Sequence, residues 1–232
     1  MTLSRPLAAL ARVLVALAVF LFLPATNVLL LTRPAFVAHE YRQPHVPPAD
    51  RYDAQTRLQL SQDTVRWLNS GQGIEELAAL RHDGQPVYNP RELRHMADVN
   101  AVMDGLRWVW RLAGVIIVGG LALAIFRPAW RRPFARGVFL GGAALVATLA
   151  GILIGALLSF DAFFVRFHQV FFEGGTWLFA YDDSLIQFYP VQFWMDATWI
   201  LGSTSLVEGL VVGSLSHVYL GRSSRRQPGD IT

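Results

Sequence analysis

Residues 137–158 read GVFLGGAALVATLAGILIGALL, a run of 22 residues without a charged side chain. The hydrocarbon core of a bilayer is about 30 Å thick and needs about 20 apolar residues in a helix. This stretch therefore predicts a membrane-spanning helix, and its many glycine and alanine residues allow a neighbouring helix to approach closely. The composition of the whole chain agrees, because 53% of its residues are hydrophobic and only 16% are charged.

Three further segments have the length and composition of spans, namely residues 13–31, 106–126 and 197–220. The first is longer than the apolar core of a typical signal peptide, and no small-residue cleavage pattern follows it directly. We therefore expect it to be retained. The sequence predicts a single membrane domain over residues 1–232, with an all-α core that is a four-helix transmembrane bundle.

The distribution of arginine predicts the orientation, since arginine supplies all 20 basic residues. Nine arginines and one acid lie before the first span, between the second and third, and after the fourth. Residues 32–105, in contrast, hold eight arginines and ten acids. The positive-inside rule then places both termini in the cytoplasm. Segments 32–105 and 159–196 are expected to be extracytoplasmic.

These two loops predict a small extracytoplasmic α+β cap. The expected elements are short helices over 57–68 and 74–80, a turn at 82–84 with a strand near 86–88, and a β-hairpin made by 177–181 and 185–189. Asn89 and Glu92 flank Pro90 in the pattern of a helix start, with Asn89 as the N-cap. That helix is expected to continue into the second span.

Two histidines stand close to the spans, and histidine is the side chain whose ordinary pKa lies nearest neutral pH. His168 lies in Phe167-His168-Gln169-Val170-Phe171-Phe172, just beyond the third span. This predicts an imidazole at the membrane surface, although an interfacial aromatic belt is the simpler alternative. His95 lies on the helix that begins at Pro90, where Asp98, three residues on, could orient its ring. A solvated polar face is the alternative for His95.

Several classes of chemistry are excluded by composition. The chain has no cysteine and no lysine, so thiol catalysis, disulfides and Schiff bases are unavailable. The arginines are spread along the chain, which does not favour nucleic-acid binding. We expect no cofactor and no metal, because the histidines form neither a His-Glu-x-x-His pattern nor a helical i, i+4 pair. A membrane metalloenzyme is nevertheless an alternative.

Four blocks of sequence together resemble a known family: His95-Met96-Ala97-Asp98-Val99, the stretch around His168, Trp177, and LIQFYPVQFWMD at residues 185–196. The chain resembles the Lit-type bacterial lipoprotein intramolecular transacylases, a four-helix integral membrane family. The resemblance extends from the first span to the fourth. The long aromatic spacing of the last block is its most specific part.

The resemblance implies an O-to-N acyl transfer within one diacylglyceryl-cysteine lipoprotein, which yields the lyso-form. The family's two functional histidines would map onto His95 and His168. The site would face the outer leaflet of a bacterial plasma membrane, and the partners would be diacylated lipoproteins and membrane lipid. We expect a monomer.

The chemistry suits these residues. An α-amine has a pKa of about 8 and must lose a proton to attack an ester, while the leaving glycerol oxygen must gain one. We assign His168 as the general base and His95 as its partner, and the two roles could be exchanged. Side chains expected to bind or orient the substrate are Asp98, Arg166, Trp177, Tyr181 and Tyr189. The oxyanion donor could be Tyr181, Tyr189, Arg166 or a backbone N–H.

A non-catalytic protein is the other alternative, either a transporter or a protein that binds lipid or a partner. Its best support is Glu208, an ionisable residue within the fourth span. Small polar residues surround Glu208 in the sequence, so we favour a structural hydrogen bond between helices.

Overall fold

The computed structural model describes residues 3–172 and 174–225. Within them, four helices are long and apolar enough to cross a membrane. They are α1 (Arg5–Leu31), α5 (Pro90–Phe126), α6 (Pro128–Leu158) and α9 (Val191–Arg225). Each contains one of the predicted spans and extends it, so the helical membrane core expected from the sequence is confirmed.

The described chain divides into two compact units. The first, here called the membrane unit, comprises residues 3–27, 107–154 and 201–225. The second, the cap unit, comprises residues 28–106 and 155–200 without residue 173. Each long helix passes from one unit into the other. The single domain predicted from the sequence stays a prediction.

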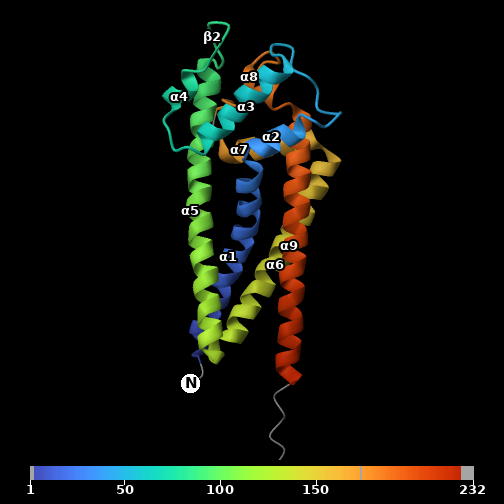
Figure 1. Ribbon diagram of the computed structural model, residues 1–232. Coiled ribbons are helices and arrows are strands. Elements are labelled where there is room, and N and C mark those ends of the chain that lie inside the picture. The colour runs from blue at the N-terminus through green and yellow to red at the C-terminus, as the bar shows by residue number, and fades with distance from the viewer. Residues whose placement is uncertain (1–2, 173, 226–232) are drawn as a thin grey trace, which may run out of the picture. The chain divides into compact units, whose positions relative to one another are not determined.

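Close backbone contacts hold the helices of the membrane unit together, and Figure 1 shows these helices running alongside one another. A Cβ atom at Gly141 of α6 would lie 2.5 Å from the carbonyl oxygen of Ala16 on α1. A Cβ atom at Gly142 would lie 2.7 Å from the carbonyl oxygen of Gly209 on α9. These glycines therefore act as the small residues that helix packing in lipid requires.

Glu208 of α9 also has a partner within the membrane unit. The Asn27 side-chain amide of α1 donates to Ser205 Oγ at 2.8 Å and to Glu208 Oε2 at 2.9 Å. Asn27 and Ser205 are both buried. Polar groups in a lipid environment are stabilised by such interhelical bonds. The geometry thus supports the structural interpretation of Glu208.

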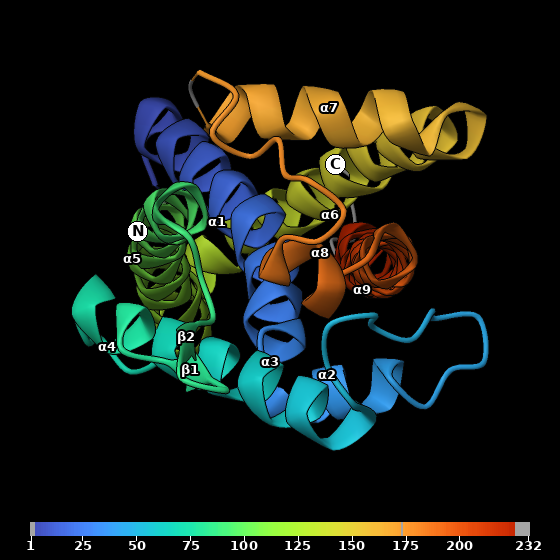
Figure 2. The ribbon, with the colours of Figure 1, turned by 90° about the horizontal axis from the view of Figure 1, so that it is seen from above.

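The cap unit is built from short helices and one small sheet, seen from above in Figure 2. Its helices are α2 (Pro34–Glu40), α3 (Ala54–Leu68), α4 (Ile74–Ala78), α7 (Phe160–Phe171) and α8 (Ser184–Phe188). Strands β1 (Arg81–His82) and β2 (Gln85–Pro86) pair antiparallel. Asp83 and Gly84 join them, with φ of 50° and 76°, the positive values that a tight two-residue hairpin needs. The core of the unit centres on Phe188, which is fully buried.

The helices predicted within the first loop are present, with α3 three residues longer and α4 two residues shorter than expected. The hairpin predicted for residues 177–189 is wrong, because residues 184–188 form the helix α8. Asp183 stands at the N-cap position of α8, and its side chain bonds Asn89, Arg91 and the Ala180 N–H instead of the first turn of that helix. Leu185 and Phe188 are both buried, the i, i+3 pattern of a helix that faces a core.

Candidate active site

His95 is held by the tightly fixed first turn of α5. The Asn89 side-chain oxygen accepts from the Glu92 backbone N–H at 3.1 Å, and Glu92 Oε2 accepts from the Asn89 backbone N–H at 2.8 Å. This reciprocal capping box confirms the predicted helix start. Glu92 Oε1 also accepts from the Leu185 N–H at 2.8 Å, which ties α5 to α8. His95 lies less than one turn further along, on a rigid element.

A second set of bonds links the same turn to the loop before α8. Asp183 accepts hydrogen bonds from the Arg91 guanidinium at 2.8 Å and from the Asn89 side-chain amide at 2.7 Å. The Arg91 guanidinium also stands 5.7 Å from the centre of the Phe179 ring. Phe179 in turn packs edge-on against His95, with 5.3 Å between ring centres. Both segments of the cap unit therefore position this imidazole.

His168 lies on α7, and its tautomer follows from its hydrogen bond. Its Nδ1 lies 2.8 Å from the carbonyl oxygen of Phe164, one helical turn earlier. A carbonyl can only accept, so Nδ1 carries the proton and Nε2 keeps a free lone pair. A ring in this state can take up a proton at Nε2, as a general base must.

The two imidazoles face each other within the cap unit. Their ring centres are 6.3 Å apart and their planes differ by 24°. Phe172 contacts both rings, at 4.8 Å from His95 and 5.6 Å from His168. Phe164 and Trp177 cover other parts of His168, at 4.1 and 4.8 Å between ring centres. Each histidine is only 8% exposed, so aromatic rings replace most of the water around the pair.

This enclosure lowers the pKa of both imidazoles, which favours their neutral forms. Residues 90–105 of α5 carry five charged side chains, so His95 lies before the apolar span that starts near Leu106. Burial, and next the proximity of His168, lower the pKa of His95 from 6.5 to about 4. Burial also lowers the pKa of His168, opposed by its bond to the Phe164 carbonyl. The Nδ1 atom of His95 is buried without a hydrogen-bond partner. A polar substrate group could therefore satisfy this ring after a small shift.

Residues 12–194 match the family described as lipoprotein intramolecular transacylase Lit. The chain belongs to the Lit family. The resemblance inferred from the histidine and aromatic blocks is thereby confirmed. The chain is an integral membrane protein of this transacylase family, with four apolar helices.

Solved structures of a Lit protein share the fold. The membrane integral lipoprotein intramolecular transacylase Lit from Bacillus cereus has a TM-score of 0.71 and 16% identity, over 96% of this chain and 99% of that chain. A variant of it with one histidine replaced by arginine has a TM-score of 0.56 and 15% identity, with 95% of both chains covered. An uncharacterized protein of Aquifex aeolicus (strain VF5) is 28% identical over 215 residues, 87% of this chain and 92% of that protein.

The other predicted site residues differ in their exposure and in their contacts. Trp177 packs on His168, and Arg166 and Tyr181 are exposed. Tyr189 is buried, and its hydroxyl donates to the Ser61 carbonyl oxygen at 2.8 Å. Asp98 is half-buried. Both Asp98 and His95 lie in the described part of the chain, and no hydrogen bond or ion pair joins them. The roles of these five side chains in substrate binding stay predictions.

Sequence reasoning named Trp177 but gave no role to the phenylalanines that also enclose the histidines. Phe164 supplies the carbonyl that sets the His168 tautomer, and Phe172 bridges the two rings. The i, i+4 spacing of Phe164 and His168 was a usable signal, but only if residues 160–171 had been recognised as a helix. Among the residues that the structure describes, no group of three His, Cys, Asp or Glu side chains is arranged to hold a metal ion.

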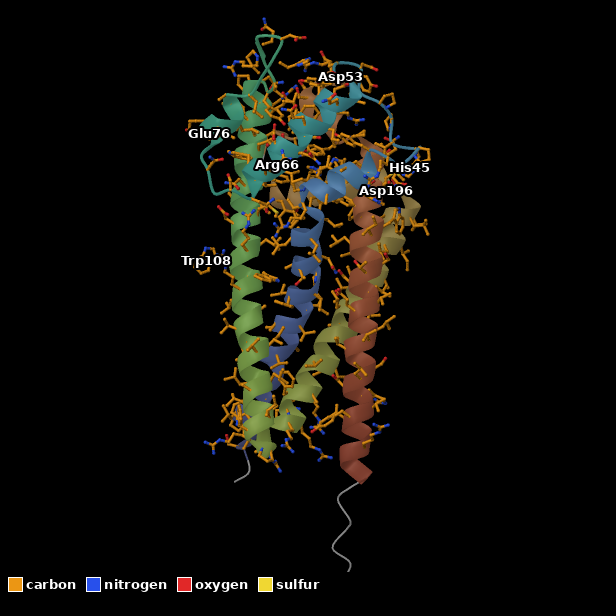
Figure 3. The ribbon with its side chains drawn as sticks, viewed as in Figure 1. His45, Asp53, Arg66, Glu76, Trp108 and Asp196 are labelled. Carbon is orange, nitrogen blue, oxygen red and sulfur yellow. The ribbon has the colours of Figure 1, made fainter. Side chains whose placement is uncertain are left out.

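A second group of titratable side chains lies at the start of α9. His45 Nε2 donates to Asp196 Oδ2 at 2.6 Å, and Figure 3 labels the two residues next to one another. Glu40, at the end of α2, is 1% exposed and faces Asp196. Burial, and next the contact with Asp196, raise the pKa of Glu40 from 4.5 to about 7.

We expect Glu40→Gln to stabilise the protein at pH 8 and to have little effect at pH 5. The folded protein holds the Glu40 proton more tightly than the unfolded chain, so its stability falls as pH rises from 4.5 toward 7. Gln removes this loss, which is on the order of 3 kcal/mol above pH 7. Thermal unfolding in detergent at both pH values measures the effect. Glu75→Gln, at an exposed site, is the control. An equal gain at pH 5 and pH 8 would contradict the raised pKa.

Proposed function

We propose that this protein catalyses an intramolecular O-to-N acyl transfer on a diacylglyceryl-cysteine lipoprotein and gives the lyso-form. Family membership supports a transacylase, and the facing pair of buried, neutral imidazoles supports this reaction. The pair is the observation that carries the proposal. His168 has a free lone pair on Nε2, and the Nδ1 atom of His95 has no hydrogen-bond partner. The site lies at the outer leaflet of a bacterial plasma membrane, with both termini cytoplasmic.

In the proposed reaction, the neutral α-amine of the cysteine attacks the sn-2 ester carbonyl. Nε2 of His168 takes one amine proton as the N–C bond forms. It then returns that proton to the glycerol oxygen as the C–O bond breaks, which leaves an amide and a free hydroxyl. His95 remains neutral and donates an N–H to the oxygen that develops negative charge, as neutral histidines do in other enzymes.

No nucleophile from the enzyme is required, because amine and ester belong to one molecule. Holding two such groups together contributes up to about 7–11 kcal/mol in favourable intramolecular cases. The aromatic enclosure supports the reaction in a second way. Excluding water prevents hydrolysis of the ester and strengthens the hydrogen bonds that form at the carbonyl oxygen. Asp98, Arg166, Trp177, Tyr181 and Tyr189 would bind or orient the substrate.

Mass spectrometry of a lipoprotein N-terminus tests the reaction. The purified protein in liposomes is incubated with a diacylglyceryl-cysteine lipopeptide, and the product is fragmented. We expect an unchanged total mass, a blocked α-amine, and an N-terminal fragment heavier by one acyl chain. A mixture of light and deuterated substrates should give no crossed products. An α-amine that stays free, or crossed acyl chains, would refute the intramolecular transfer.

The pH dependence of kcat/KM should show two ionisations on its acid side. Only the neutral amine attacks, so log kcat/KM should rise with a slope near one below the amine pKa of about 8. Because burial lowers the pKa of His168, the slope should steepen toward two only below pH 6.5. His95, with a pKa of about 4, stays neutral throughout most of this range.

Rates measured from pH 4.5 to pH 9 with the lipopeptide provide this test. His168→Ala should keep a slope near one at all acidic pH values, since its base is absent. A wild-type profile that steepens above pH 6.5 would contradict a buried, neutral base at this position.

A further inference from the structure

The apolar surface of α7 is divided into two strips with different surroundings. Phe164 and His168 form the inner strip, which packs against Trp177 and Trp194 of the cap unit. Phe167, Val170 and Phe171 form the outer strip, and they are 45%, 76% and 48% exposed. Val170 and Phe171 follow Phe167 by three and four positions, so all three lie on one face of the helix.

Ring contacts connect the outer strip to both imidazoles. The Phe167 ring meets His168 edge-on, with 5.5 Å between ring centres, and it is tilted by 47° to the Phe171 ring, with 4.9 Å between their centres. Phe171 lies next to Phe172, the residue that bridges His95 and His168. An apolar chain lying along this strip would therefore end at the histidine pair.

Lipid is the occupant that best fits the strip. Only Ser159 separates α7 from α6, and Leu157 and Leu158 at the end of that apolar span are themselves 73% and 81% exposed. Ring contacts then run along α7 from Phe160 to Phe163 and from Phe163 to Phe167, so apolar side chains connect the start of α7 to the strip. The remaining surface of α7 carries exposed polar side chains, namely Asp161, Arg166 and Gln169. A helix with this division lies in the plane of a bilayer surface, with its apolar side in the acyl region.

We propose that the outer strip of α7 is immersed in lipid and is the surface along which the transferred acyl chain reaches the histidine pair. The exposed residues of the strip and the apolar side chains that connect it to α6 support its immersion in lipid. The guidance of the acyl chain rests on the proposed function. Val170 is the most exposed member, so it presents the largest apolar side-chain surface of the strip to an acyl chain in the bilayer.

Spin labelling tests the immersion without any measurement of activity. The chain has no cysteine, so Val170→Cys carries the only thiol available to a nitroxide label. In liposomes, we expect this label to collide with oxygen more often than with a water-soluble nickel chelate. Gln169→Cys, the adjacent polar residue, is the matched control and should show the reverse preference. A label at position 170 with the water-like preference of the control, or one shielded from both reagents by a protein partner, overturns the proposal.

Kinetics with substrates of different acyl length test the guidance. We expect Val170→Ser to raise KM for a 16-carbon chain by about 5-fold, because it removes an apolar contact and adds a hydroxyl. The increase in KM should be smaller for an 8-carbon chain, which has fewer methylene groups to lie along the strip, and both kcat values should change little. Val165→Ser, on the other edge of α7, is the control. An equal change in KM for the two variants, or an equal change in KM for both chain lengths, overturns the proposed guidance of the acyl chain. If the wild type transfers no acyl group, the proposed function itself fails, whatever the spin label reports.

Discussion

His168→Ala lowers the rate of acyl transfer by about 10²- to 10⁴-fold, the range expected when a positioned general base is lost. The reason is specific to this ring. Its Nδ1 proton is committed to the Phe164 carbonyl, so Nε2 is the atom that accepts the amine proton. Direct transfer to water is a poor replacement, because the aromatic rings around the pair exclude solvent.

Single-turnover measurements on the purified variant in liposomes give this rate. His168→Gln is the more informative variant, since its amide can retain a hydrogen bond to the Phe164 carbonyl but cannot act as a base near neutral pH. We expect it to be as inactive as His168→Ala. The exposed neighbour Gln169→Ala should keep the wild-type rate. A His168→Gln variant with more than a tenth of the wild-type rate would assign the base to another group.

His95→Ala should lower the rate by about 10²- to 10³-fold, the usual effect of removing one donor to a developing oxyanion. The substitution also opens space beside Phe172 and Phe179, so folding must be checked by thermal unfolding. His95→Asn keeps an N–H donor and should recover part of the loss. Because this variant retains the base at His168, its kcat/KM profile should still steepen below pH 6.5.

The double variant separates the roles of the two rings. If both act in one step, His95→Ala with His168→Ala should be little slower than His168→Ala alone. Effects that multiply fully would mean that the rings act in different steps. A His95→Asn profile without the steeper acid limb would assign the base to His95, and the two roles would then be exchanged.

Membrane spans and helix starts were predictable because their signals are local. The uncharged run from Gly137 to Leu158 needs a helix in lipid whatever surrounds it, since its backbone must satisfy its own hydrogen bonds. The start of α5 was equally clear, because Asn89 and Glu92 cap one another within four residues. Local chemistry also placed the turn at Asp83 and Gly84.

The segment after α6 was harder, because its aromatic residues suit a strand as well as a buried helix. The predicted hairpin at 177–189 failed where Asp183 is engaged by Asn89 and Arg91 from a distant part of the chain. Those bonds fix Asp183 at a helix start, and no pattern within the segment reveals them.

The amino-acid sequence by itself determined that the chain crosses a membrane, where its four spans run, and that His95 and His168 stand close to spans. It did so because hydrophobicity and capping act over one or a few helical turns. Only the tertiary structure decided that these imidazoles face each other and which nitrogen of His168 is free. That arrangement depends on Phe172, Phe179 and Trp177 packing around rings from separate helices, and such contacts form only when the cap unit folds.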